Sequence, residues 1–137
     1  MPLTLTITEG LLSPDDARTA LRRLSEAMLR WHGLAGNQFM TSVVIGSLHV
    51  LEADHSYSSP DGPIAVVEWK VPPVAFASRE IQRGYIDEAT TIIHELTGGK
   101  QAKNRIWVNV VHAVDGTWGV AGHAMTSEEL GHAIARG

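Results

Sequence analysis

The chain begins with a stretch in which apolar and polar side chains alternate. In residues 3–8, three apolar side chains fall on one face and three threonines fall on the other. Such alternation predicts a β-strand with one buried face. In residues 13–33 the apolar positions instead recur every three or four residues, which predicts an amphipathic helix. Ser13 and Pro14 fit the N-cap and the first position of that helix.

The pattern of strand and helix then repeats. A second strand is expected in FMTSVVIGS, residues 39–47, and a third in residues 63–71. Apolar residues at helical spacing predict a second long helix within residues 78–99. A fourth strand is expected in residues 105–114.

These elements form two β-α-β units, residues about 2–47 and about 63–113, in a single α/β domain that spans 1–137. Parallel strands joined by a helix cross over right-handed, so we expect one four-stranded mixed sheet with both helices on one face. Residues about 114–137 are expected to add a small hairpin and a short terminal helix.

The opposite face of this sheet has no helix to cover it within one chain. We expect it to be apolar, because five large side chains are assigned to it: Val43, Val44, Ile45, Trp107 and Val111. A monomer rarely exposes so many apolar residues together, so the sequence predicts association of several copies through this face.

Composition excludes several classes of function. The 137 residues include 11 Lys and Arg against 15 Asp and Glu, a net charge of −4, and the basic residues are scattered, so no nucleic-acid partner is expected. The absence of cysteine excludes disulfides and thiolate metal sites. No apolar run has the length of a membrane span, and no signal-peptide pattern opens the chain. We therefore expect a cytoplasmic protein without a membrane partner.

Seven histidines raise the question of a metal site. Their spacing does not fit a local ligand set, because His94 lacks the second histidine of an HExxH motif and His49 lies too far from His55. The sequence also has no Gly-rich phosphate loop and no GxSxG nucleophile motif. We expect neither a metal nor a cofactor.

Pro2 has the clearest catalytic potential. Removal of Met1 leaves Pro2 as a free secondary amine at the start of a buried strand. Burial disfavours the charged form of an amine and lowers its pKa, which favours a neutral base at physiological pH. Such a base can take a proton from a carbon beside a carbonyl group and return it elsewhere.

Four short stretches carry a resemblance to the tautomerase superfamily: PLTLTITEG at the start, VLE at 50–52, IWV at 106–108 and TWG at 117–119. With its duplicated β-α-β layout, the chain resembles the longer, tandem members of the 4-oxalocrotonate tautomerase-like fold. These include the malonate semialdehyde decarboxylase and cis-3-chloroacrylate dehalogenase groups. The resemblance implies a homotrimer in which a neighbouring subunit partly encloses each Pro2. It also implies an isomerase that interconverts the enol and keto forms of a small 2-oxo acid or related carbonyl compound.

The sequence departs from both groups where they bind and activate substrates. Their arginine pair near the end of the third strand is absent from KVPPVAFAS, where Lys70 is the nearest cation. The acidic residue of the decarboxylase group aligns with Asn37. The histidine and tyrosine of the dehalogenase group align with Met28 and Asn109, and its glutamate falls near Val120. Hydrolytic dehalogenation and arginine-assisted decarboxylation are therefore disfavoured.

Four residues remain as candidates for substrate binding. We expect Lys70 to attract a carboxylate, although without the bidentate geometry of arginine, and Asn109 to orient a carbonyl group. Trp118 and His123 lie on the terminal hairpin, which in the superfamily reaches toward an active site of the same or an adjacent subunit. Two alternatives stay open: a decarboxylase, hydratase or dehalogenase of the same superfamily, and a noncatalytic trimeric binder of small molecules.

Overall fold

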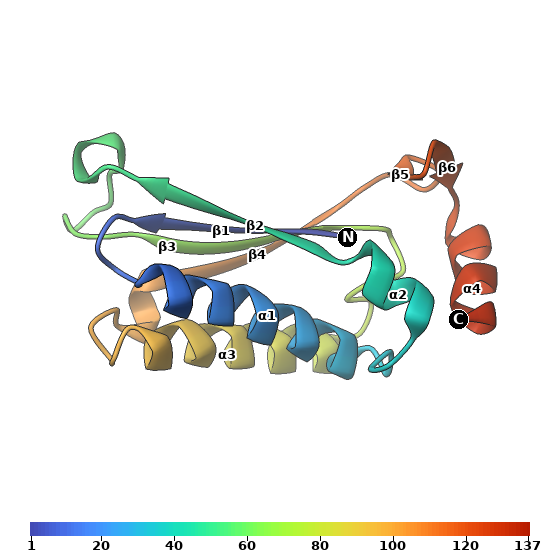
Figure 1. Ribbon diagram of the computed structural model, residues 1–137, viewed down its shortest axis with the longest axis horizontal. Helices are drawn as coiled ribbons and strands as arrows, with labels where there is room; N and C mark the ends of the chain where they lie inside the picture. Colours follow the sequence, from blue (N-terminus) through green and yellow to red (C-terminus); the bar gives the residue numbers. More distant parts are fainter.

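The computed structural model describes residues 1–137, in which two long helices cover one face of a four-stranded sheet (Figure 1). The strands β1 (Pro2–Thr8), β2 (Ile45–Leu51), β3 (Ala65–Val71) and β4 (Ile106–His112) lie in the order β2-β1-β3-β4. β1 is parallel to β2, β3 is parallel to β4, and the two pairs meet antiparallel through β1 and β3. The predicted mixed sheet of tandem β-α-β units is confirmed.

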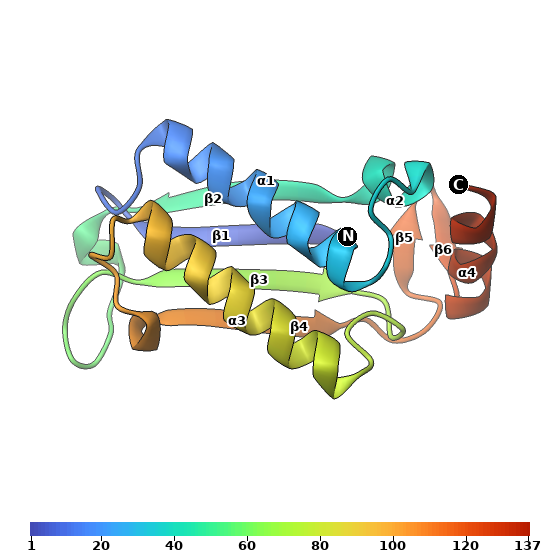
Figure 2. The same cartoon turned by 90° about the horizontal axis from the view of Figure 1, so that it is seen from below.

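The first long helix begins at the serine that the sequence suggests, and the second begins at a serine as well. The side chain of Ser13 accepts a hydrogen bond from the N–H of Asp16 and caps α1 (Pro14–Trp31). Ser78 caps α3 (Arg79–Leu96) in the same way. Figure 2 shows the two helices side by side across the strands. Each links two parallel strands, as a β-α-β crossover requires.

The core lies between these helices and the sheet. Trp69 of β3 and Tyr85 of α3 are its largest fully buried side chains, and Trp69 Nε1 donates a hydrogen bond to the Tyr85 hydroxyl at 2.5 Å. Burial raises the pKa of the Tyr85 phenol, so this residue stays protonated. The strand residues buried beneath the helices are Leu3, Leu5, Ile7, Ala65, Val67, Trp69, Val71 and Ile106.

The predicted position of the second strand is wrong. Most of its first half forms a short helix, α2 (Gln38–Val43), and β2 begins only after it. The Asn37 side chain accepts a hydrogen bond from the N–H of Met40 at 2.9 Å and thereby caps this helix. Val43 and Val44 consequently end the helix and are half-buried, so they do not lie on the open face of the sheet.

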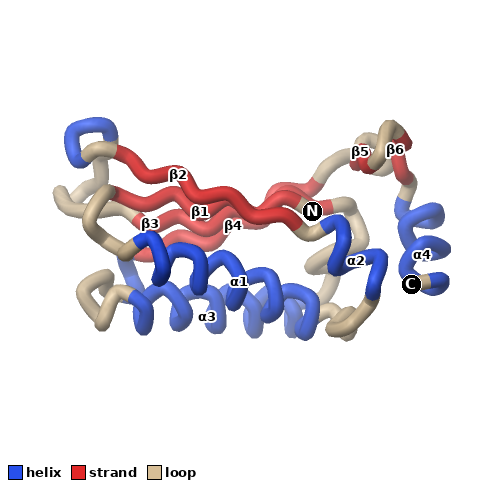
Figure 3. The backbone as a smooth tube through the Cα atoms, viewed as in Figure 1, coloured by secondary structure: helices blue, strands red, loops and turns tan.

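The C-terminal segment folds beyond the end of the sheet, as a hairpin followed by a helix (Figure 3). β5 (Trp118–Val120) pairs antiparallel with β6 (His123–Met125). Thr126 and Glu129 then form a capping box at the start of α4 (Ser127–Arg136). The predicted hairpin and terminal helix are therefore present.

Two single-turn 3₁₀ helices complete the chain. η1 (Ala53–His55) follows β2, and η2 (Lys103–Arg105) leads directly into β4. No helix of the chain combines the length and the hydrophobicity that crossing a membrane requires.

The sheet face opposite the helices is uncovered, as predicted. Ile45, Trp107 and Val111 are 63%, 41% and 46% exposed on it. Polar side chains lie between these three residues. The register of the four strands places the following polar residues on the same face: Thr4, Thr6, Ser47, His49, Glu68, Lys70 and Asn109. The prediction of an apolar face is therefore correct for Ile45, Trp107 and Val111 but wrong for the face as a whole, which is mixed.

Candidate active site at the start of the first strand

Met1 is buried at the start of β1, with 4% of its surface exposed. Its backbone is held by the residues that join α2 to β2. The α-amino group of Met1 donates a hydrogen bond to the carbonyl oxygen of Val43. The N–H of Ile45 donates to the carbonyl oxygen of Met1 at 3.2 Å. This carbonyl group is bonded to the nitrogen of Pro2, so both contacts lie next to the candidate base.

A cavity of about 230 Å³ adjoins Met1. The end of α1, α2, the loop after β3 and α4 all contribute to its walls. Seven of the nine residues around it are hydrophobic, and none is Lys, Arg, Asp or Glu; they are Met1, His32, Leu34, Met40, Pro72, Val74, Ala75, Leu130 and Ile134. An apolar group is the ligand chemistry that such walls accommodate.

These surroundings change the basicity of an amine. Burial lowers the pKa of the Met1 α-amino group to about 6, because apolar surroundings disfavour the ammonium form. The Met1 amine is therefore mostly neutral at pH 7. Pro2 itself is exposed, and its nitrogen is one residue away from the Met1 amine.

His32 is the polar member of the cavity wall. Its Nε2 accepts a hydrogen bond from the N–H of Phe76 at 2.9 Å, so its proton lies on Nδ1, which donates to the carbonyl oxygen of Met28 at 2.7 Å. Burial lowers the pKa of this imidazole and favours the neutral form. Nearby, His112 Nε2 donates to the carbonyl oxygen of Ala75 at 2.8 Å. Two histidines thus hold the loop between β3 and α3.

The sheet register brings three predicted site residues onto the open face at the same end of the sheet. The antiparallel pairing of β1 with β3, continued by one residue, makes Pro2 and Lys70 neighbours across the two strands. Lys70 is exposed, and its Nζ lies 3.9 Å from the Glu68 carboxylate. Asn109 is exposed on the same face and pairs with Glu68, which lies two residues before Lys70 on β3.

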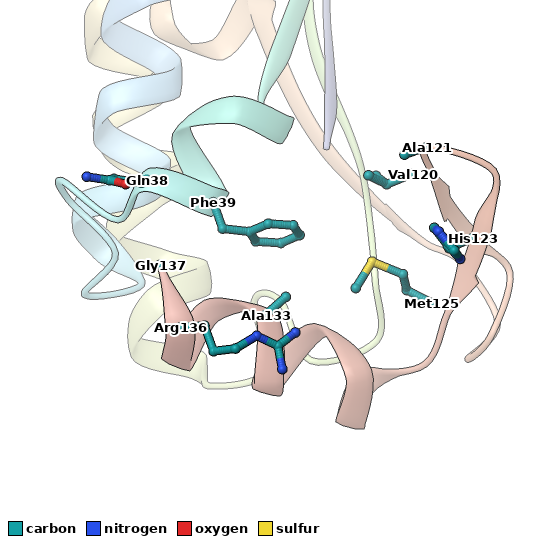
Figure 4. A pocket seen from close by; sticks show the side chains of 9 residues that line it. All are labelled: Gln38, Phe39, Val120, Ala121, His123, Met125, Ala133, Arg136 and Gly137. Atoms are coloured by element: carbon teal, nitrogen blue, oxygen red, sulfur yellow. The ribbon is translucent and has the colours of Figure 1, made fainter.

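The two candidates on the terminal hairpin lie elsewhere. Trp118 is buried, with 7% of its surface exposed, and belongs to the hydrophobic core rather than to the cavity beside Met1. His123 faces a wider hollow of about 570 Å³ between α2, the hairpin and α4, together with Met125 and Arg136 (Figure 4). The structure therefore groups Pro2 with Lys70 and Asn109, and it separates Trp118 and His123 from them.

One group of potential metal ligands is present at the far end of β2. The donor atoms of Glu52, Asp54 and His55 lie within 4.8 Å of one another, and all three residues are exposed. Exposed acidic groups commonly gather in this way without an ion. The group is also remote from Pro2, because β1 and β2 are parallel and Pro2 pairs with the first residue of β2.

No protein-family model matches the chain, and none of the curated proteins matches it. Solved structures do match. Pt0534, inactivated by 2-oxo-3-pentynoate, is 20% identical with a TM-score of 0.77, and the match covers 96% of this chain and 99% of that chain. A fused 4-OT that forms a symmetric trimer is 17% identical with a TM-score of 0.77, over 96% and 99% of the two chains.

A third match is a member of one of the groups that the sequence resembles. The protein N1, a member of the cis-3-chloroacrylic acid dehalogenase family, is 11% identical with a TM-score of 0.70, over 96% of this chain and 90% of that chain. Because the identities are low, these likenesses concern the fold. The chain has the fold of the tautomerase superfamily in its fused, tandem form, as its sequence predicts.

Proposed function

We propose that this protein is a tautomerase that uses the nitrogen of Pro2 as a general base, once Met1 has been removed, on a small 2-oxo acid or related carbonyl compound. The observation that supports the proposal most directly is the burial of Met1 beside an apolar cavity. Removal of Met1 converts the peptide nitrogen of Pro2 into a secondary amine and opens it to this space.

The surroundings favour a neutral amine at that position. Burial lowers the pKa of the Met1 amine to about 6, and the same apolar walls would act on the amine of Pro2. The positive charge of Lys70 on the neighbouring strand also disfavours an ammonium group. An amine that is mostly unprotonated at neutral pH is ready to accept a proton.

The proposed reaction moves one proton between carbon and oxygen. The neutral amine of Pro2 takes a proton from C3 of a 2-oxo acid, the electron pair of the C–H bond forms the C2=C3 double bond, and the carbonyl π pair moves to oxygen. The pyrrolidinium then gives its proton to that oxygen, which yields the enol, and the reverse sequence yields the ketone. Lys70 would bind the carboxylate, and Asn109 would orient the substrate.

We also propose that the chain forms a homotrimer through the open face of the sheet. Ile45, Trp107 and Val111 expose large apolar side chains there, and burial of such groups drives association. The fused 4-OT with the same fold is described as a symmetric trimer. In this arrangement a neighbouring subunit covers Pro2 and Lys70, which removes them from bulk water.

The test compares two forms of the protein, released from one fusion so that the first residue is either Met1 or Pro2. Their turnover of phenylenolpyruvate is measured under identical conditions. We expect the form that begins with Pro2 to be faster by a factor of about 100 or more, since a positioned general base contributes at least about 100-fold. Pro63→Ala, at the proline that precedes β3, is the matched control and should leave the rate unchanged.

Equal rates for the two forms, or a fully active Pro2→Ala variant, would show that the proline is not the base. An inactive protein that still assembles as a trimer would instead favour the noncatalytic binder.

A further inference from the structure

The backbone contacts of Met1 point to a second catalytic group and to a substrate class. We propose that the N–H of Ile45 binds the carbonyl oxygen of the substrate, and that the apolar cavity beside Met1 receives an uncharged apolar side arm. The inference rests on the proposed role of Pro2 as the base. In effect, Met1 occupies the place of the substrate: its carbonyl group marks the reacting oxygen, and its side chain marks the arm.

The proposed hydrogen-bond donor, the N–H of Ile45, already binds a carbonyl oxygen in the structure. The N–H of Ile45 donates to the carbonyl oxygen of Met1 at 3.2 Å, and that oxygen is two bonds away from the nitrogen of Pro2. Removal of Met1 takes away this acceptor but leaves the donor in place at the start of β2. A backbone N–H that has lost its partner is free to bond a new acceptor, and a substrate that covers it must supply that acceptor, because leaving a covered donor unsatisfied is costly.

The same donor suits the chemistry of the proposed reaction. When the amine of Pro2 takes the proton from C3, the electron pair of the C–H bond becomes the C2=C3 bond, and negative charge develops on the carbonyl oxygen. A donor fixed in the backbone stabilises this charge without having to reorganise. The pyrrolidinium then returns the proton to the oxygen, so Ile45 neither gains nor loses a proton.

The walls of the cavity beside Met1 indicate the chemistry of the substrate's side arm. Met1 is buried within the hydrophobic core, and no charged side chain borders the adjoining cavity. His32 is the only polar residue around it, and both of its ring nitrogens already have partners in Met28 and Phe76. A carboxylate placed there would lose its water without gaining a hydrogen bond, which is strongly unfavourable. The geometry therefore fits a 2-oxo acid whose arm is apolar and comparable to a methionine side chain.

Two 2-oxo acids with different side arms test this assignment, using the protein that begins with Pro2. The arm of 2-oxo-4-methylthiobutanoate is the methionine side chain, whereas 2-oxoglutarate carries an arm of similar length that ends in a carboxylate. Exchange of the C3 protons for deuterium is followed by NMR. We expect kcat/KM to be about tenfold higher or more for the methylthio acid. Equal values, or a preference for 2-oxoglutarate, would overturn the assignment of the arm.

A pair of variants tests the donor. Ile45→Pro removes the N–H, whereas Ile45→Ala keeps it and serves as the matched control. Val44 has φ −87° and ψ 119°, a conformation suited to the residue before a proline, and β2 is an edge strand, where proline is tolerated at the first position. Thermal unfolding checks that both variants fold. Both variants lose the isoleucine side chain, so we expect kcat of Ile45→Pro to lie about 100-fold below that of Ile45→Ala, as for the loss of an oxyanion donor.

Equal exchange rates in Ile45→Pro and Ile45→Ala, with the activity of Pro2 intact, would overturn the donor while leaving the base in place. If no form exchanges the C3 protons, the proposed role of Pro2 as the base is wrong. Binding measurements then test separately whether Ile45 and the cavity bind the substrate. Chemical-shift titration with 2-oxo-4-methylthiobutanoate should show binding to the form that begins with Pro2, about tenfold weaker binding to Ile45→Pro, and none to the form that retains Met1. Equal binding to all three, or to none, would overturn the inference.

Discussion

The Nε2 atom of His32 accepts a hydrogen bond from the backbone N–H of Phe76 at 2.9 Å and thereby ties the end of α1 to the loop before α3. Phe76 has φ 56°, a left-handed conformation that a bulky residue rarely adopts. Its ring lies edge-on to His32 and to Tyr85, with centroids 4.6 and 5.2 Å apart. The loop that His32 holds also supplies Ala75 to the wall of the cavity beside Met1.

The stability of the protein should therefore fall when the pH drops below about 6.5. Burial lowers the pKa of His32 in the folded protein below its unfolded value of about 6.5. The unfolded chain consequently binds a proton first, so the contribution to stability is fully present above the unfolded pKa and is lost as the pH falls through the folded pKa. Denaturant unfolding at a series of pH values measures this loss.

His32→Gln should remove this part of the pH dependence and lower the free energy of unfolding at pH 7 by about 1–3 kcal/mol, because the Phe76 N–H loses its acceptor. His132→Gln, at an exposed histidine of α4, is the matched control and should keep the wild-type pH dependence. The same pH dependence in His32→Gln as in wild type would contradict the assignment.

Lys70→Ala should raise KM for 2-oxo acids about tenfold and change kcat less. The ammonium group is proposed to bind the carboxylate in the ground state and the transition state alike, and a charged hydrogen bond is worth about 1.5–3 kcal/mol. Lys100→Ala, at an exposed lysine beyond α3, provides the control. An unchanged KM in Lys70→Ala, combined with faster turnover of neutral carbonyl compounds, would exclude an anion site at Lys70.

The wild-type protein should sediment as a trimer at micromolar concentration, and Trp107→Glu should shift it toward the monomer. Trp107 is 41% exposed on the open face, where a carboxylate would have to lose its hydration water in the proposed interface. Tyr57→Glu, at a loop residue that is 83% exposed, should leave the mass unchanged. A wild-type protein that sediments as a monomer would count against the proposed assembly.

The scaffold is predictable from the sequence wherever the deciding interactions are local. The alternation in β1 and the cap at Ser13 act within a few residues, so the pattern reveals them directly. α2 is different. Its apolar run with β-branched residues favours a strand, but the Asn37 side chain caps a helix and also donates to the carbonyl oxygen of Ile134, 97 residues away in the sequence. No local pattern reveals such a contact.

The candidate site also combines features that the sequence pattern predicts with features that depend on contacts between distant residues. The proximity of Pro2 and Lys70 depends on the antiparallel pairing of β1 with β3. The sequence predicts the two β-α-β units and a mixed sheet, but not the order of its strands. The cavity could not be predicted from the sequence, because its walls combine residues from α1, α2, the loop after β3 and α4. His32 gave no signal beyond being one of seven histidines, since its role depends on the distant N–H of Phe76.

Titration of the Pro2 amine tests the proposed function most directly. Nitrogen-15 NMR on protein that begins with labelled Pro2 gives the pKa of this amine, and the pH dependence of kcat/KM for C3 exchange is recorded on the same sample. If Pro2 is the base, its pKa lies well below the usual α-amino range of about 7.7–8.0, and kcat/KM rises with the same pKa, because the neutral amine is the active form. An amine that titrates within or above that range, or a kcat/KM that does not follow its titration, would contradict the proposal.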